Sequence, residues 1–198
     1  MKTNQISAER GVTKRKTYLV WLPLVVVLLK ASTALGTTKQ EQTTFVADPA
    51  ERLERPVPVP DAVLRILSKD EMVIGCMQSN PIPSGRSLAS WFAVSEIHLN
   101  GPNEADLVVL PVVQGSPSMC FHSVEGIGWF WVFRPIGPHY RLVLKTAGLG
   151  LSVLDTRHNG YRDIRSGGQV GNTATAVTFR YGTGGRYQEY RRKTTELH

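Results

Sequence analysis

The chain has 198 residues, a formal net charge of +7 at neutral pH and two cysteines. Its first 36 residues contain six basic side chains and one acidic side chain, so the rest of the chain carries a formal charge of only +2. This small excess argues against a nucleic-acid-binding domain, which needs a concentrated basic surface. The length beyond residue 36 suits one domain with a hydrophobic core and is short for two.

The N-terminal segment has the three parts of a secretory signal. Basic residues come first, an apolar run from Tyr18 to Leu29 follows, and Ala34-Leu35-Gly36 places small residues where a signal peptidase cuts. The apolar run is shorter than the roughly 20 residues that a membrane-spanning helix needs. We therefore expect residues 1–36 to be a cleaved signal peptide, with an uncleaved anchor as the alternative. Export then sends the remainder to the periplasm or the medium, with no stable membrane anchor after cleavage.

Residues 37–60 have the composition of an extended leader. Their first part is polar, and prolines alternate with valines from Pro56 to Pro60, which favours polyproline-like chain. Asp61 then suits a helix N-cap, and apolar residues follow it at helical spacing. The sequence predicts one short helix near residues 61–69 and no other substantial helix.

From Met72 onward the pattern is that of β-structure, because short apolar or alternating runs are separated by Gly/Pro turns. Gly182–Gly185 joins the last two runs and predicts a hairpin. We expect a mainly β domain over residues 61–190, built as an antiparallel sheet, a sandwich or an incomplete propeller, followed by a polar tail at 191–198. The expected strands lie around Met72–Cys76, Trp91–Leu99, Leu107–Leu110, Trp129–Phe133, Tyr140–Lys145, Val177–Tyr181 and Arg186–Tyr190.

Cys76 and Cys120 are the two cysteines, and both follow the expected signal peptide. In an oxidising compartment such a pair predicts a disulfide, which would stabilise the fold by about 4 kcal/mol in the chain-entropy model. The alternative is a small secreted hydrolase in which Cys120 is the nucleophile and His122, on the same face of a strand, is the base. The sequence has no other familiar catalytic signature, such as G-x-S-x-G, H-E-x-x-H or a glycine-rich phosphate loop.

Two segments share a spacing, from His98 to Asp106 and from Asp155 to Asp163. In each, a polar residue opens a loop, an aspartate closes it eight positions later, and an apolar residue follows. The second segment, D-x-x-x-N-G-x-x-D-I, resembles the loops of FG-GAP and VCBS-type repeats, and the first resembles a worn copy. The pair is also similar to the loops of a group of uncharacterised exported bacterial proteins. In the repeat family, such loops precede a propeller strand and often bind calcium.

The resemblance implies a set of oxygen ligands that these loops only partly supply. Calcium takes six to eight oxygens, and Arg157 stands at a position where the family has an oxygen ligand. The plausible donors are Asp155, Asn159 and Asp163 in the second loop and Asn100 and Asp106 in the first.

We therefore expect structural loops, with no metal or other cofactor, and keep a calcium-stabilised repeat module as an alternative. In this interpretation Asp163 and Asn159 accept backbone N–H bonds, and Gly160 supplies a left-handed turn. Arg157 then pairs with Asp155 or Asp163 in place of a metal.

An aromatic run at residues 129–133 has two readings. In a strand, Trp129, Trp131 and Phe133 point one way and Phe130 and Val132 the other, which suits a central strand with both faces buried. If one face is open, Trp129, Trp131 and Phe133 instead form a platform for a sugar or a protein. The sequence as a whole favours an exported, non-enzymatic binding domain. Its expected partner is a protein or glycan of the cell envelope, or an inhibited hydrolase, and not a nucleic acid.

Overall fold

The computed structural model describes residues 41–47, 53–112 and 117–197. All of them belong to one unit of the chain, residues 39–198. The expected signal peptide at 1–36 lies outside the described residues. No helix of the described part is long and apolar enough to cross a membrane.

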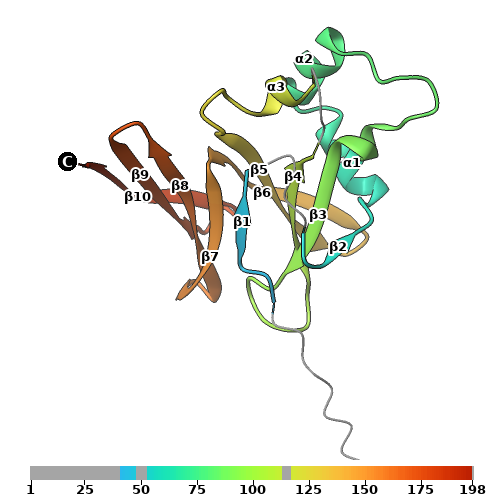
Figure 1. Cartoon of the computed structure of the whole chain (residues 1–198). Helices are drawn as coiled ribbons and strands as arrows, with labels where there is room; N and C mark the ends of the chain where they lie inside the picture. Colours follow the sequence, from blue (N-terminus) through green and yellow to red (C-terminus); the bar gives the residue numbers. More distant parts are fainter. Residues whose placement is uncertain (1–40, 48–52, 113–116, 198) are drawn as a thin grey trace, which may run out of the picture. The chain divides into compact units, whose positions relative to one another are not determined.

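The ten strands of the described residues form two antiparallel five-stranded sheets that pack as a sandwich (Figure 1). This confirms the predicted mainly β fold, and the arrangement is a sandwich rather than a propeller. The C-terminal sheet has the order β1-β7-β8-β9-β10: β1 Thr44–Val46, β7 Gly150–His158, β8 Tyr161–Val170, β9 Thr173–Tyr181 and β10 Tyr187–Glu196. The central sheet has the order β2-β3-β4-β5-β6: β2 Pro56–Val57, β3 Phe92–Ile97, β4 Asp106–Pro111, β5 Gly128–Ile136 and β6 His139–Gly148.

The central sheet is buried on both faces. Against the C-terminal sheet it forms one apolar cluster, in which Phe130 and Val132 of β5 meet Ile164 of β8. Its other face packs against the helices, which lie at the upper right of Figure 1. These are α1 Asp61–Leu67, α2 Glu71–Ser79, the 3-10 turn η1 Leu88–Trp91 and α3 Ser118–Phe121.

The aromatic run lies on β5, inside this doubly covered sheet. Trp131 and Phe133 have no exposed surface and belong to the helix-side cluster, while Phe130 and Val132 belong to the cluster between the sheets. The two-sided core is therefore confirmed, and the open aromatic platform is wrong. Only Trp129 is half-buried, and its ring is covered by the ammonium of Lys145, 5.0 Å from the ring centre.

The strand expected at Met72–Cys76 is wrong, because this segment belongs to α2. Asp70 is the N-cap of α2, and its carboxylate accepts hydrogen bonds from two backbone amides of the first turn. This satisfies amide groups that a helix start otherwise leaves unpaired. The helix buries Val73 and Cys76 on one face, so tertiary packing outweighs the β propensity of the sequence.

The domain also extends beyond residues 61–190. Two strands lie within the expected leader, since β1 pairs with β7 and β2 pairs with β3. The expected polar tail is part of β10, which pairs with β9 as far as Glu196. Both β2 and β10 are edge strands, where backbone pairing on one side suffices and prolines or charged side chains are tolerated.

The predicted disulfide is confirmed: Cys76 of α2 is bonded to Cys120 of α3, with Cα atoms 5.5 Å apart. Cys120 therefore lies on a helical turn, not on a strand beside His122 as expected. In this bonded form the Cys120 sulfur is not a thiolate, so it cannot act as the nucleophile of a dyad. The His122 ring instead contacts the Ser118 carbonyl oxygen, 3.2 Å from Nδ1.

Candidate functional site

The two segments with matching spacing meet at one end of the sandwich, at the bottom of Figure 1. The carbonyl oxygen of Leu99 in the first accepts hydrogen bonds from the Arg162 amide (2.7 Å) and the Arg157 guanidinium (3.1 Å) in the second. We call this end the loop face. It comprises residues 98–106 and 155–163 with the adjoining side chains of Glu41, Arg134, Arg180 and Tyr181.

The second segment, expected to be a loop, is instead a β-hairpin that consists of the end of β7, a tight turn and the start of β8. Asn159 and Gly160 have φ values of +52° and +82°, the two consecutive left-handed residues of an Asn-Gly hairpin turn. The Asn159 side chain donates to the Tyr181 carbonyl oxygen (2.7 Å), whereas the sequence suggested that it accepts a backbone N–H. The turn is thereby tied to the end of β9.

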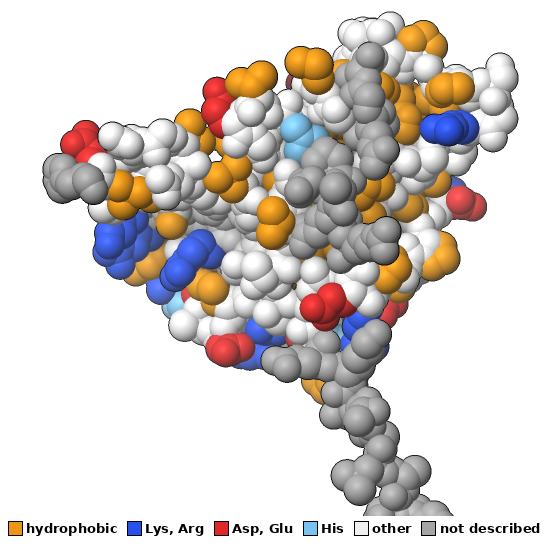
Figure 2. All heavy atoms as spheres, in the orientation of Figure 1, with side chains coloured by type: hydrophobic (Ala, Val, Ile, Leu, Met, Phe, Trp, Pro, Cys, Tyr) orange, Lys and Arg blue, Asp and Glu red, His pale blue; other side chains and the backbone are white. Residues whose placement is uncertain are grey.

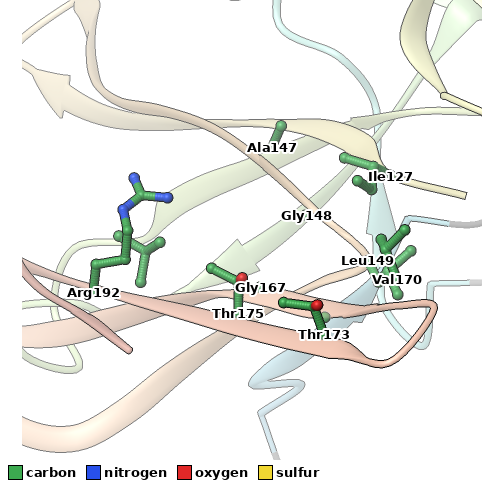
Figure 3. A pocket seen from close by; sticks show the side chains of 11 residues that line it. Ile127, Ala147, Gly148, Leu149, Gly167, Val170, Thr173, Thr175 and Arg192 are labelled. Carbon is green, nitrogen blue, oxygen red and sulfur yellow. The ribbon is translucent and has the colours of Figure 1, made fainter. Parts of the chain in front are cut away.

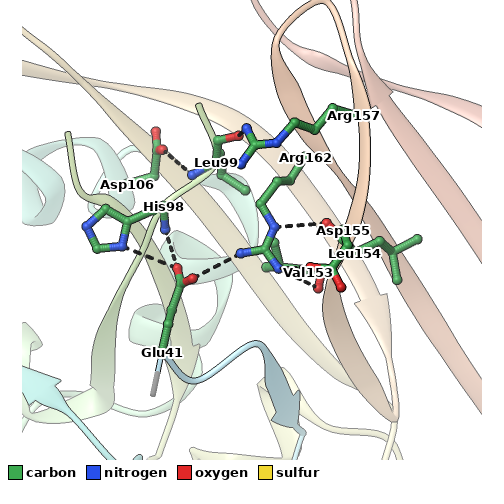
Figure 4. A network of polar contacts seen from close by, with 9 residues as sticks. All are labelled: Glu41, His98, Leu99, Asp106, Val153, Leu154, Asp155, Arg157 and Arg162. Carbon is green, nitrogen blue, oxygen red and sulfur yellow. Dashed lines mark hydrogen bonds and ion pairs between the residues drawn. The ribbon is translucent and has the colours of Figure 1, made fainter. Parts of the chain in front are cut away.

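Arg162, which the sequence did not single out, is the main polar anchor of the loop face (Figure 4). Its nearly buried guanidinium donates to Glu41 Oε2 (3.0 Å), to Asp155 Oδ1 (3.1 Å) and to the carbonyl oxygens of residues 153 and 154. The expected pairing of Arg157 with Asp155 or Asp163 is wrong, because Arg157 binds the carbonyl oxygens of Leu99 and Gly160. Both arginines therefore hold backbone in place.

Glu41 extends this network to the first loop. Its Oε1 accepts from the backbone amide of His98 and lies 3.4 Å from Nδ1 of the same residue. Arg162 thus connects, through one carboxylate, the segment before β1 to the loop after β3. The resulting contacts make the loop face a cross-linked part of the fold.

Asp163 lies almost fully buried on the outer face of the C-terminal sheet, with 3% of its side chain exposed. It accepts hydrogen bonds from Thr156 Oγ1 (2.8 Å) and from the His158 ring (2.7 Å), and Arg180 lies 3.7 Å away. Its partners are side chains and not the backbone amides that the sequence suggested. Asp163 therefore fixes the ring of His158 and the guanidinium of Arg180.

Asp106 closes the first loop and is also buried, with 1% of the residue exposed. Its Oδ2 accepts from the Leu99 amide (3.1 Å), whereas Oδ1 has no hydrogen-bond partner in the described part of the chain. Burial raises the pKa of Asp106 to about 6, outweighing the Leu99 hydrogen bond, which lowers it.

The raised pKa of Asp106 predicts that the stability of the folded protein depends on pH. The folded protein holds this proton more tightly than the unfolded chain, so stability falls as pH rises from about 4 to about 6, by up to about 3 kcal/mol. Asp106→Asn keeps an acceptor for Leu99 and is expected to abolish this slope. Urea unfolding of both proteins between pH 4 and 7 measures it, with Asp61→Asn, at an exposed position, as the matched control. Parallel profiles for wild type and Asp106→Asn would contradict the assignment.

A polar hollow of about 290 Å³ opens on the loop face between the first loop and β5. Asn100 Nδ2 donates to Glu104 Oε2 (3.2 Å), and Arg134 lies 3.5 Å from the same oxygen. The Arg134 guanidinium also lies 4.3 Å from the Tyr161 ring centre. The residues that line the hollow are Asn100, Gly101, Asn103, Glu104 and Arg134.

Tyr181 holds Arg134 from the other side. Its hydroxyl lies 3.2 Å from Arg134 Nη1, and its ring lies against that of Tyr161, with centroids 3.9 Å apart. The two half-buried tyrosines thus hold a cation at the rim of the hollow. Neither the tyrosines nor Arg134 had a sequence signal, since they come from three different strands.

The loop face offers little for calcium. Among the residues that the structure describes, no group of three or more His, Cys, Asp or Glu side chains is placed to hold a metal ion. Of the expected oxygen donors, Asp155 pairs with an arginine, Asn159 donates to a carbonyl, and Asp163 and Asp106 are buried in separate surroundings. These four side chains therefore have separate partners in the fold.

Comparison of the chain with protein-family models, with curated proteins and with solved structures found no match. The resemblance to FG-GAP and VCBS-type loops stays a prediction from the sequence.

Proposed function

We propose that the protein is an exported, non-enzymatic binding domain whose loop face binds a glycan of the cell envelope. The observation that carries the proposal is the polar hollow, with Arg134 fixed at its rim over Tyr161. Acidic and basic side chains lie beside one another along this lower edge of the molecule (Figure 2). Such a surface suits a polar, uncharged partner better than a strongly charged one.

The groups around the hollow match the chemistry of a sugar. Each sugar hydroxyl both donates and accepts, and the hollow offers the amides of Asn100 and Asn103, the Glu104 carboxylate and the Arg134 guanidinium. The loop that carries them is held by Arg157 and the Leu99 amide, so little ordering is needed on binding.

Export is supported by the disulfide between α2 and α3, since such bonds persist in oxidising compartments. The non-enzymatic role is supported by the contacts of the charged side chains in the β7–β8 hairpin. Arg157 and Arg162 bind backbone carbonyls, and Asp163 orients two neighbouring side chains. An envelope protein is the alternative partner, and the experiment below separates it from a glycan.

Binding of the purified full chain to an envelope polysaccharide fraction, and separately to an envelope protein fraction, tests the proposal. Asn103→Ala removes an exposed amide at the hollow and is expected to weaken polysaccharide binding about 5–10-fold, the value of one hydrogen bond. Asn172→Ala makes the same change in an exposed turn between β8 and β9 and is expected to bind as wild type does. Binding of the chain to the protein fraction alone would overturn the glycan proposal. Equal polysaccharide binding by the two variants would overturn the assignment of the site to the hollow.

A further inference from the structure

A second hollow, of about 210 Å³, lies between the β6–β7 connection and the strands β8, β9 and β10 (Figure 3). Its lining is mainly apolar and comes from Ile127, from residues 147–149 and from the three strands. Ile127, Leu149 and Val170 gather at one end, and the nearly buried Val177 lies at the other end, opposite Arg192 in the pairing of β9 with β10. None of the residues at the loop-face hollow takes part, so this pocket is a separate feature of the fold.

Close backbone packing fixes the walls of this pocket. A Cβ atom on Gly167 would lie 2.1 Å from the Thr175 carbonyl oxygen, and one on Gly168 would lie 2.4 Å from the Leu149 Cβ. Gly148 would meet Ser166 Oγ at 2.6 Å in the same way. Because these segments already touch at the glycines, their spacing is fixed by close contact, and the pocket is pre-formed.

The pocket has a charged end opposite its apolar end. Arg192 of β10 lies there, and it is the only charged residue among the described residues that line the pocket. Its guanidinium is paired with Glu189 at 2.8 Å, but both side chains are about half exposed. An exposed pair of this kind contributes little to stability, so Arg192 can exchange Glu189 for a ligand anion at small cost.

We propose that this pocket binds a small molecule with an apolar body and a carboxylate head, such as a medium-chain acyl carboxylate. The apolar body would lie against Ile127, Leu149 and Val170, and the carboxylate would pair with Arg192. The size is suitable, because an apolar cavity of about 150 Å³ holds a benzene molecule, and this pocket is somewhat larger.

Calorimetric titration of the full chain with octanoate, 1-octanol and octylamine tests the charge preference. Octanoate is expected to bind about tenfold or more tightly than 1-octanol, since a charge-assisted hydrogen bond is added, and octylamine more weakly than either. Val170→Trp, at the partly exposed rim, is expected to fill the pocket and abolish binding of octanoate and 1-octanol together.

Arg192→Gln is expected to lower octanoate affinity about tenfold and to leave 1-octanol binding unchanged. Arg191→Gln is the matched control, because Arg191 is the next residue on β10, is exposed and does not line the pocket. Glu189→Gln frees Arg192 and is expected to tighten octanoate binding. Absence of octanoate binding at millimolar concentration, equal losses in both arginine variants, or binding that survives Val170→Trp would each overturn the proposal.

Discussion

Replacing Asp70 with alanine is expected to lower the free energy of unfolding by about 3–4 kcal/mol at neutral pH. The Asp70 carboxylate caps α2, accepts from Trp131 Nε1 (3.2 Å) and pairs with Lys145 Nζ (2.8 Å). Alanine would leave the buried indole N–H and the partly buried ammonium without their acceptor, besides exposing the start of the helix. The three losses fall on the interface between α2 and the central sheet.

The effect of Asp70→Ala should depend on pH with a definite sign. Burial raises the pKa of Asp70, but the hydrogen bonds from Lys145 and Trp131 outweigh it, so the pKa lies below its ordinary value. The stabilisation is therefore complete above the unfolded-state pKa of about 4 and is lost as pH falls through the lower folded-state pKa.

Urea unfolding of wild type and Asp70→Ala at pH 7 and near pH 2.5 measures the loss in unfolding free energy and the direction in which it changes with pH. The difference between the two proteins should shrink at the lower pH. Glu71→Ala is the matched control, since Glu71 is the exposed neighbour in the first turn of α2 and should change stability by only about 0.5 kcal/mol. Equal losses for the two variants at pH 7 would refute the role given to Asp70.

The strands that the sequence predicts well are those whose side chains alternate between two environments. β5 and β6, and the hairpin of β9 and β10, follow this pattern, and the structure has them close to the expected positions. α2 was missed because Met72, Val73 and Ile74 are read as a strand when the cap at Asp70 is ignored. β1 and β2 are missed because strands of three and two residues are too short to show an alternating pattern. β7 and β8 are missed because residues 155–163 are interpreted as a loop.

At the loop face, the shared spacing predicts that segments 98–106 and 155–163 are related. It does not predict which hydrogen bonds and ion pairs their side chains form. The pairing of β7 with β8 has a register shift between Val153 and Arg157, and Asp155, within this stretch, binds Arg162 of the opposite strand rather than Arg157 of its own strand. The shift depends on the register of two strands, so no local pattern predicts it. The pocket at Arg192 depends on how the β6–β7 connection meets β8 and β9, which is equally non-local.

Removing the disulfide with the double variant Cys76→Ala and Cys120→Ala is expected to lower the free energy of unfolding by about 4 kcal/mol. The bond closes a segment with a sequence separation of 44 and holds α2 to α3 over the aromatic cluster that includes Phe121 and Trp131. Cutting it releases this chain segment in the unfolded state, which then gains entropy.

Urea unfolding with and without reductant measures this contribution. Reductant should destabilise the wild type by about the same amount as the double variant loses, and it should have no effect on the double variant. If the unfolding midpoint of the wild type does not change when reductant cleaves the disulfide, the expected contribution of the bond to stability is wrong.

The proposed binding role requires that the protein works outside the cytoplasm as a disulfide-bonded domain. The intact mass of protein isolated from its native source in the presence of a thiol-alkylating reagent tests this most directly. We predict a chain that begins close to Thr37, with no alkyl group on Cys76 or Cys120. A chain that retains Met1 and carries two alkyl groups would contradict export, the oxidised state and the envelope partner together.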